Sequence, residues 1–254
     1  MQKSNSMPLV TIITVVYNGE KYLEQTFSSV FNQSYENIEY IIIDGGSTDS
    51  TLEIIKKNED KISFWVSEPD NGLYDAMNKG IQRANGTLIG MINSDDWYEL
   101  DAVETMVDMY LKHPEKTIFH ADRYDIDDEN NKSVKKFNPS SFKFKYYGMT
   151  YNHPSMFITK TEYDEHLYSV DFKSHSDYKF VLESFMKDKN KFYYINKAIV
   201  NYRLDGVSAN MPWLTSSIDV YKIRRSVGMN IFESIFSFFF MRIVSVISRS
   251  KGVL

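Results

Sequence analysis

Two adjacent carboxylates, Asp95 and Asp96, directly follow an apolar run in the stretch IGMINSDDWYELD, residues 89–101. Like charges side by side repel each other, and burying them without a partner costs several kcal/mol. Water at a surface turn would satisfy them, with Asp96 capping a helix that begins near Glu99. A divalent cation would also satisfy them, because a hard metal accepts carboxylate oxygens. The pair alone leaves both alternatives open. Whether water or a cation neutralises it depends on the strands and loops that position it.

The chain before this pair alternates short apolar runs with helical patterns. The runs at residues 9–16 (LVTIITVV) and 38–43 (IEYIII) are rich in β-branched residues, as is typical of parallel strands covered on both faces. The alternation continues with helices near residues 48–57 and 73–83 and strands near residues 62–66 and 87–92. Repeated units of this kind predict an α/β fold with a mostly parallel central sheet, flanked by helices and built with right-handed crossovers.

Each of the four predicted strands is followed by a polar loop. These loops read YNG, DGGS, EPDNG and NSDD in chain order. Glycine, asparagine and aspartate are common turn residues, so one such loop has little meaning by itself. In a parallel sheet, however, ligands bind beyond the carboxyl ends of the strands, and these four loops share that edge. The sequence therefore predicts a ligand site there.

The second half of the chain has a different pattern. Residues 125–131 (DIDDENN) lack the glycine of a calcium-binding loop and predict a hairpin turn. Further on, the patterns predict a strand around residues 155–158, a helix over residues 176–186, and two strands near Phe192 and Ile199. We find no repeat, low-complexity tract or Pro/Gly-rich linker, so a second independent globular domain is not expected.

Composition excludes several kinds of function. The 254 residues contain no cysteine, which excludes disulfides, thiolate nucleophiles and zinc-thiolate sites. The net charge of -5 argues against a general nucleic-acid-binding protein. The N-terminus carries one lysine and no apolar segment before the first strand, so it does not read as a secretory signal.

Six motifs together resemble the inverting nucleotide-sugar glycosyltransferases of family 2. They are VTIITVVYNGEKYLEQTFSSVFNQ, IEYIIIDGGSTDST, EPDNGLYDAMNKG, GTLIGMINSDDWY, HPSMF and SDYKF. They occur in the family's order over about two hundred residues. The resemblance implies a GT-A fold, in which a Rossmann-like catalytic domain spans residues 1–210 and a C-terminal helical appendage spans residues 211–254.

The resemblance also implies which residues contact the nucleotide-sugar donor. Carried over position by position, they are Val16, Tyr17, Asn18, Asp44, Asp70, Asn78, Lys79, Asn93, Ser94 and Asp95. This chain departs from the family at Gly45, where a second aspartate often follows the strand-ending acid and contacts a uracil ring. From the residues alone, Asp44, Asp70 and Lys79 are equally well read as cap and surface residues.

The opening motif matches the family's metal-binding D-x-D-D element, with Asn93 in the first place. The resemblance implies that Asp95 and Asp96 are the anionic ligands of Mn²⁺ or Mg²⁺. Which of the two binds the ion directly is left open. A cation there would bridge the diphosphate oxygens and neutralise the charge that develops as nucleoside diphosphate leaves.

An inverting transfer needs one general base to remove the proton of the acceptor hydroxyl. The resemblance assigns this role to Asp177, although an acid in the first turn of a helix is also explained by the helix dipole. It further implies acceptor or phosphate contacts from His153, Trp97 and Arg203, the last in a late loop reading NYRLDGVS. The alternatives are a structural imidazole, a packing aromatic residue and a surface arginine.

The tail combines apolar residues with positive charge. From Lys222 onward there are six basic residues and one acid, so this segment carries +5 and the first 221 residues carry -10. The stretch of residues 231–247 (IFESIFSFFFMRIVSVI) is too short and too charged to span a bilayer well. Ser234, Ser237, Ser245 and Ser248 fall roughly on one helical stripe. Two readings remain: a helix at the membrane surface, with Arg224, Arg225, Arg249 and Lys251 contacting lipid heads, or a helix packed on the domain or a partner subunit.

These expectations combine into one functional hypothesis. The chain is expected to be a metal-dependent inverting hexosyltransferase that uses a nucleotide-sugar donor, with a UDP-sugar favoured. Its expected acceptor is a polyprenyl-diphosphate-linked glycan of bacterial O-antigen or capsule synthesis, at the cytoplasmic, inner face of the cell membrane. The alternative is a nucleotide-sugar-binding module that has lost catalysis, which the residues Asn93 and Gly45 suggest. The oligomeric state is left open.

Overall fold

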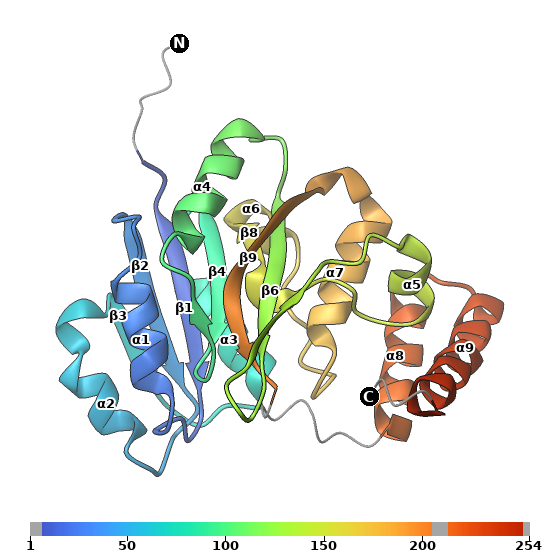
Figure 1. Cartoon of the computed structure of the whole chain (residues 1–254), viewed down its shortest axis with the longest axis horizontal. Helices are drawn as coiled ribbons and strands as arrows, with labels where there is room; N and C mark the ends of the chain where they lie inside the picture. The colour runs from blue at the N-terminus through green and yellow to red at the C-terminus, as the bar shows by residue number, and fades with distance from the viewer. Residues whose placement is uncertain (1–6, 205–212, 251–254) are drawn as a thin grey trace.

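The computed structural model describes residues 7–204 and 213–250. It confirms an α/β fold in which helices cover both faces of a curled central sheet (Figure 1). Within the described residues, the strand order is β3-β2-β1-β4-β8-β6-β9-β5, and β7 pairs with β6.

The first half of the chain supplies four parallel strands. These are β1 (Val10–Val16), β2 (Ile38–Asp44), β3 (Phe64–Ser67) and β4 (Leu88–Asn93). The register pairs Val16 with Asp44 and Val15 with Asn93, so the carboxyl ends of the three central strands lie level. The polar loops after these strands therefore meet at one edge of the sheet, as predicted.

Helices cover both faces of these strands because successive strand side chains point to opposite sides. Ile12 belongs to the core layer under α1 (Leu23–Phe31), α2 (Thr51–Lys57) and α4 (Ala102–Lys112), whereas Ile13 belongs to the layer under α3 (Leu73–Arg83). This two-sided burial explains why the strands read as nearly continuous apolar runs.

The second half of the chain extends the sheet with mixed pairing. Its strands are β5 (Trp97–Tyr98), β6 (Ile118–Ile126), β7 (Lys132–Lys135), β8 (Phe157–Thr159) and β9 (Phe192–Arg203). The predicted hairpin turn joins β6 to β7, and Asp127 Oδ1 accepts the Asn131 N–H at 2.8 Å. The prediction of two strands near Phe192 and Ile199 was wrong. They form one strand, because shifts of register against β6 interrupt the side-chain pattern without ending the strand.

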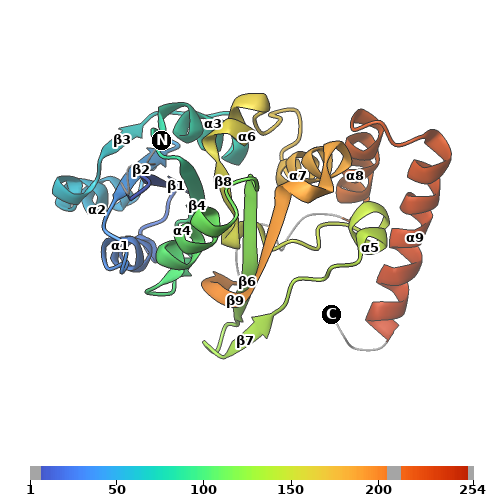
Figure 2. The ribbon, with the colours of Figure 1, turned by 90° about the horizontal axis from the view of Figure 1, so that it is seen from above.

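The remaining helices belong to the second half of the chain, and all but the one at residues 160–165 gather at the end of the molecule away from β3 (Figure 2). They are α5 (Ser141–Tyr146), α6 (Lys160–Glu165), α7 (Ser176–Lys187), α8 (Trp213–Ser226) and α9 (Ile231–Ser250). Short 3₁₀ turns lie at Glu59–Lys61, His153–Ser155 and Lys189–Lys191. Val220 and Ile223 of α8 share a core layer with α7, so α8 packs directly on the sheet domain. The domain boundary expected after residue 210 falls outside the described residues and stays a prediction.

Candidate active site

Hydrogen bonds join the loops after β1 and β2 into one ordered edge. The Asn18 N–H donates to Ser47 Oγ at 2.7 Å, and Asn18 Oδ1 accepts the Thr48 N–H at 2.9 Å. Asn18 has a φ of 52°, a left-handed conformation that its short polar side chain tolerates. The Val16 carbonyl accepts the Gly45 N–H at 2.9 Å. Tyr17, between them, is 64% exposed and presents its ring at this edge.

Asp44 organises the loop after β2 from a fully buried position. Its Oδ2 accepts the N–H groups of Gly46 and Ser47 at 3.1 and 3.0 Å and the Ser67 hydroxyl at 2.6 Å, and its Oδ1 accepts the Ser47 hydroxyl. The donor contact expected of Asp44 stays a prediction, and the contacts that its carboxylate makes in the structure are with the protein itself.

Gly45 leaves room for the carboxylate of Asp70. A Cβ atom built on Gly45 would lie 2.5 Å from Asp70 Oδ2 and 3.5 Å from Tyr17 Cδ2. The other oxygen, Oδ1, accepts the Gly72 N–H at 2.8 Å, which fixes the direction of the side chain. The acid missing at position 45 is therefore replaced in space by an acid from the loop after β3, next to an exposed aromatic ring.

The motif at the end of β4 separates its two carboxylates. Asp96 is 1% exposed, and it accepts the Arg203 N–H through Oδ1 and the Asn93 amide through Oδ2, both at 3.0 Å. Asp95 is only partly buried, as are Asn93 and Ser94. Asp95 is thus the more accessible of the two acids at this edge.

Burial and the neighbouring charge of Asp95 raise the pKa of Asp96 to about 8. Within the described residues, its hydrogen-bond donors are a backbone N–H and a neutral amide, so neither supplies a positive charge. A buried acid beside a second acid is the donor set that a hard divalent cation stabilises. The residues present therefore fit Mg²⁺ or Mn²⁺, which Asp95 and Asp96 would hold.

Arg203 lies beside this motif between two aromatic rings. Its Cζ is 4.0 Å from the ring centroid of Tyr22 and 4.8 Å from that of Trp97, and its Nη2 donates to Gln25 Oε1 at 2.8 Å. Its buried Nε has no hydrogen-bond partner in the described part of the chain. An anionic ligand would satisfy this N–H, which otherwise costs free energy. The rest of the expected closing loop, residues 205–208, lies outside the described residues.

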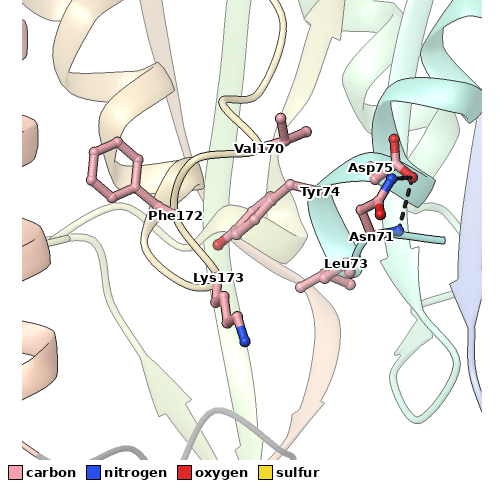
Figure 3. Close-up of a pocket in the computed structure, with 8 residues that line it drawn as sticks. Asn71, Leu73, Tyr74, Asp75, Val170, Phe172 and Lys173 are labelled. Carbon is pink, nitrogen blue, oxygen red and sulfur yellow. Dashed lines mark hydrogen bonds between the residues drawn. The ribbon is translucent and has the colours of Figure 1, made fainter.

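Asp177, at the start of α7, is held by Tyr74, which the sequence did not predict as a site residue. The hydroxyl of Tyr74, in the first turn of α3, donates to Asp177 Oδ1 at 2.9 Å. Burial and the charge of Asp177 raise the pKa of Tyr74 well above its ordinary value, so the phenol stays protonated as the donor. Figure 3 shows Tyr74 beside a pocket of about 310 Å³, between the start of α3 and the loop of Val170, Phe172 and Lys173.

His153 lies in the same cavity as Asp177, at the start of a 3₁₀ turn. Its Nε2 is 2.8 Å from the Tyr168 hydroxyl, which is 3.0 Å from the Tyr163 hydroxyl. Burial lowers the pKa of His153, and the negative charge of Asp177 opposes this shift in part. The imidazole is therefore neutral at neutral pH, as a hydrogen-bonding group and not as a cation.

Asn78 and Lys79 do not face this cavity in the structure. Both amide atoms of Asn78 bond to the backbone of Tyr168, at 2.8 and 3.0 Å, which anchors the segment before α7. Lys79 pairs with Glu68 at 2.8 Å and lines a separate pocket beside β3. The donor contacts expected of these two residues remain untested, and their present contacts are with the protein itself.

One cavity of about 540 Å³ connects the parts of this site. It is lined by Asn93 of the β4 motif, by His153 and by Asp177. Four cationic side chains that the sequence reading missed also line it: Arg123, Lys135, Lys136 and Lys143. A local signal could have found the lysines, because residues 130–145 hold five lysines and no acid, whereas Arg123 of β6 joins them only in the folded chain.

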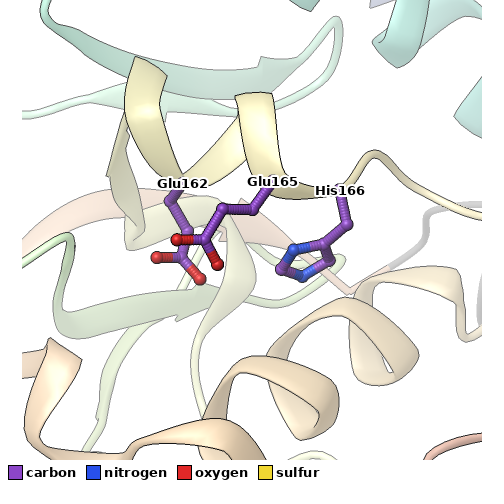
Figure 4. A group of neighbouring side chains, drawn as sticks. All are labelled: Glu162, Glu165 and His166. Atoms are coloured by element: carbon purple, nitrogen blue, oxygen red, sulfur yellow. The ribbon is translucent and has the colours of Figure 1, made fainter.

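A second acidic group lies on α6 and is explained by local ion pairing. Figure 4 shows Glu162, Glu165 and His166 close together. Lys191 Nζ contacts Glu162 at 2.9 Å and Glu165 at 3.0 Å, so a lysine already pairs with both carboxylates. Burial disfavours ionisation of Glu162, but the hydrogen bonds from Lys191, Thr117 and Ser184 outweigh it, and the pKa of Glu162 is lowered. We assign this cluster a structural role.

Helix α9 buries two serines and exposes several large apolar residues. Ser234 and Ser237 are fully buried, and the Ser237 hydroxyl donates to the Tyr146 carbonyl at 2.9 Å. Phe232, Phe239 and Ile243 are 82%, 60% and 57% exposed. Among the described residues, no helix has both the length and the hydrophobicity needed to cross a bilayer.

The expected lipid contact of Arg224 was wrong, because this side chain is 1% exposed and its Nε donates to the Lys145 carbonyl at 2.7 Å. Arg225 is exposed. The side chains of Ser245, Ser248 and Arg249, and the whole of Lys251, lie outside the described part of the chain.

Comparison with known sequences shows the family to which the chain is similar. The family model described as Glycosyl transferase family 2 matches residues 11–168. A Haemophilus influenzae protein described as an uncharacterized glycosyltransferase is 31% identical over 232 residues, which cover 88% of this chain and 92% of that protein. The hyaluronan synthase of Pasteurella multocida is 28% identical over 83% of this chain, and the chondroitin synthase of Escherichia coli is 29% identical over 82%. This chain spans only 22% and 31% of those two synthases.

Solved structures show the same fold at low sequence identity. The S. aureus TarS structure of residues 1–349 in complex with UDP-GlcNAc has a TM-score of 0.70 and 17% identity, covering 86% of this chain and 65% of that chain. A mannosyltransferase from Pyrobaculum calidifontis in complex with GDP-Man and Mn²⁺ has a TM-score of 0.62 and 14% identity, covering 98% of this chain and 77% of that chain. At these identities the likeness establishes the fold.

Proposed function

This chain belongs to glycosyl transferase family 2, and we propose that it transfers a sugar, with inversion, from a UDP-sugar to a hydroxyl group of a glycan acceptor. The observation that carries the proposal is the shared cavity, which joins the motif at the end of β4 to Asp177 at the start of α7. A donor bound at the motif and an acceptor bound against Asp177 would meet within it.

The donor base is proposed to bind between Tyr17 and Asp70. An exposed aromatic ring offers a stacking face, and the Asp70 carboxylate can accept the ring N–H of uracil. Asp70 thereby takes the role of the acid that is absent at Gly45. The structures of TarS with UDP-GlcNAc and the relatives named as hyaluronan and chondroitin synthases support a UDP-sugar.

The diphosphate is proposed to lie at the β4 motif. Asp95, supported by Asp96 and Asn93, would hold Mn²⁺ or Mg²⁺, which when bound neutralises charge on the leaving nucleoside diphosphate. The unpartnered Nε–H of Arg203 would donate a hydrogen bond to a phosphate oxygen. The ring of Trp97 stacks against the same guanidinium group. In this proposal Asp44 holds the backbone of the loop after β2, and Asn78 holds the backbone at Tyr168, so neither contacts the donor.

Asp177 is proposed as the general base. It removes the proton of the acceptor hydroxyl while the oxygen attacks the anomeric carbon from the face opposite the diphosphate. The C–O bond to the acceptor forms as the bond to the diphosphate breaks, and the proton moves to the Asp177 carboxylate. Tyr74 holds one carboxylate oxygen, and neutral His153 is placed to hydrogen-bond the acceptor.

The acceptor is proposed to be a polyprenyl-diphosphate-linked glycan of bacterial O-antigen or capsule synthesis, met at the inner face of the cell membrane. The exposed apolar face of α9 supports this proposal, because patches of large apolar side chains mark membrane or protein contacts. A binding module without catalysis is the second candidate, since Asn93 brings no charge to the metal motif.

A panel of nucleotide sugars tests the donor assignment. In the presence of Mn²⁺, UDP-sugars should raise the melting temperature and should be consumed with release of UDP. Binding without release in the presence of membrane extracts that supply acceptors would favour the binding module. Failure of every nucleotide sugar to bind would reject the proposed function.

A paired substitution tests the replacement of the acid at position 45. Asp70→Ala should weaken UDP binding roughly 10- to 100-fold, because a hydrogen bond to a charged group contributes about 1.5–3 kcal/mol. Adding Gly45→Asp should restore binding, since the new side chain enters the space that Asp70 vacates. Asp60→Ala, at an exposed acid far from this edge, is the control. Unchanged UDP affinity in Asp70→Ala would remove Asp70 from the donor site.

A further inference from the structure

The large cavity gathers positive charge in an acidic protein. Beyond Asp177, its charged lining consists of Arg123, Lys135, Lys136 and Lys143, whereas the first 221 residues together carry -10. Arg123 already pairs with Asp125 at 2.7 Å and lies over the ring of Tyr202. The three lysines, which we call the cavity lysines, have exposed side chains and no ion pair among the described residues. They therefore offer positive charge to a ligand.

The backbone that carries Lys135 and Lys136 is firmly anchored. The amide of Asn152, next to His153, donates to the carbonyls of Ala121 and Lys135, both at 3.2 Å. The following Phe137 N–H donates to Asp122 Oδ1 at 2.8 Å. These hydrogen bonds thus fix the backbone that carries Lys135 and Lys136 beside the cavity.

Lys143 lies on a helix that connects the cavity to α9. The N-cap of α5, Ser140, accepts the Lys143 N–H through Oγ at 3.2 Å, and the side of the helix that carries Phe142 and Tyr146 packs against α9. The ring centroid of Phe142 lies 5.4 Å from that of Phe240, and the centroid of Tyr146 lies 5.6 Å from that of Phe236. One short helix thus faces the catalytic cavity with a cation and the apolar tail with aromatic rings.

A second cavity extends the same path. It has a volume of about 310 Å³, shares Tyr147 and Met149 with the first cavity, and reaches Met241 and Arg242 of α9. The first cavity thus holds a carboxylate and cations, and the second cavity connects it to α9, which exposes large apolar side chains. A lipid-linked acceptor presents a hydroxyl, a diphosphate and a hydrocarbon chain, which match these three kinds of side chain.

We propose that the cavity lysines bind the diphosphate of a lipid-linked acceptor, while Asp177 contacts the hydroxyl of the sugar attached to it. This inference rests on the proposed function and adds the anion-binding part of the acceptor site. Because one cavity holds both the lysines and Asp177, only a short glycan separates the diphosphate from the reacting hydroxyl. The enzyme then acts early in assembly, on a product of a reaction that loads the first sugars onto a lipid phosphate.

The test measures binding of farnesyl diphosphate to the full chain by calorimetry, with divalent metal chelated so that the donor motif does not hold the probe. The variant is Lys135→Gln/Lys136→Gln/Lys143→Gln, and Lys56→Gln on α2 is the matched control, because Lys56 is exposed and lies in another part of the sheet domain. The wild type should bind farnesyl diphosphate at least tenfold more tightly than farnesol. The triple variant should lose tenfold or more of that affinity, and Lys56→Gln should lose none.

Three results would overturn the inference. Undiminished affinity of the triple variant would remove the lysines from the site. Equal affinity for inorganic pyrophosphate and farnesyl diphosphate would show a site for a free anion. Tighter, lysine-dependent binding of an unsulfated chondroitin hexasaccharide would show a site for a polyanionic glycan.

Stabilisation by UDP with Mn²⁺, measured on the same proteins, separates this inference from the proposed function. The triple variant should keep the wild-type shift, which also shows that it folds. If the wild type shows no shift, the donor proposal fails, and the farnesyl diphosphate result is judged separately.

Discussion

The two acids of the β4 motif differ in burial and in hydrogen bonding. Asp96 is buried against the backbone of Arg203 and the amide of Asn93, while Asp95 remains partly exposed. The sequence predicted the pair and its place at the end of a strand. It could not predict which acid is buried, because the covering backbone comes from β9, more than one hundred residues later in the chain.

The raised pKa of Asp96 makes stability depend on pH when no metal is bound. An unfolded aspartate ionises near pH 3.8, whereas Asp96 in the folded protein ionises near pH 8. Between these values the native state binds one more proton, so the free energy of unfolding should fall by up to about 1.4 kcal/mol per pH unit as pH rises. Asp96→Asn lacks this dependence and should gain stability relative to wild type from pH 5 to pH 8.

Urea unfolding in EDTA at several pH values checks this prediction. The difference between Asp96→Asn and wild type should widen with pH, and Mn²⁺ should narrow it by stabilising the ionised carboxylate. A difference that stays constant from pH 5 to pH 8 would contradict the raised pKa.

Tyr74 is predicted to act as a positioning residue for Asp177. Tyr74→Phe removes the 2.9 Å hydrogen bond to Asp177 Oδ1 and keeps the ring in its packed position. We expect kcat to fall roughly tenfold, in line with about 1–1.5 kcal/mol for one hydrogen bond, while UDP affinity and donor KM stay near the wild-type values. The pH profile of kcat should also shift, because the environment of the base changes.

Steady-state kinetics with varied donor checks this split between kcat and KM. Tyr35→Phe is the matched control, since its hydroxyl donates to the Pro8 carbonyl at the opposite edge of the sheet. A fall in kcat of the same size in both variants would mean that the loss is a general effect of stability.

At the level of elements, the strands and helices of the first half were largely predictable. The segment predicted at residues 73–83 is helix α3 (Leu73–Arg83), and the predicted strand ends coincide with the functional edge. Burial on both faces and polar strand ends are local signals, which explains this success. The second half was harder, because β9 contains bulges and because the contact between Tyr74 and Asp177 joins residues 103 positions apart.

The orientation of α9 was not readable from its sequence. Ser234 and Ser237 face the protein, and Phe232, Phe239 and Ile243 face outward. Periodicity shows that a helix has two faces, but the partner decides which face is covered. Here the partner is α5, whose Tyr146 carbonyl accepts a hydrogen bond from the Ser237 hydroxyl.

The outward face of α9 is predicted to bind membranes. Phe232→Gln/Phe239→Gln/Ile243→Gln removes the three most exposed of its described large apolar side chains, and each fully buried apolar side chain contributes about 1.5–3 kcal/mol. We expect binding to phosphatidylglycerol-containing vesicles to fall at least tenfold, while UDP binding is kept. Leu111→Gln, at a residue of α4 that is 59% exposed, should leave vesicle binding unchanged. Vesicle co-sedimentation checks this prediction, and equal pelleting of all three proteins would reject the membrane contact.

At the scale of the whole molecule, the two halves of the chain divide the proposed reaction. The loops after β1 to β4 supply the donor side, and the segments from β6 onward supply Asp177, His153 and the cavity lysines for the acceptor. The negative net charge lies mainly on the sheet domain, whereas the tail carries +5. This distribution favours an approach with the tail toward an anionic membrane and the sheet domain away from it.

The central claim is that Asp177 is the base of a sugar transfer whose donor is held at the β4 motif. The most direct measurement compares wild type with Asp177→Asn for two quantities, donor affinity and rate of transfer from a UDP-sugar in the presence of Mn²⁺. Asp177→Asn should bind UDP-sugar as the wild type does, because the donor side is separate, and should lose at least a hundredfold in transfer rate, since general base catalysis contributes roughly 10²–10⁴. Transfer at the wild-type rate in Asp177→Asn would contradict the account.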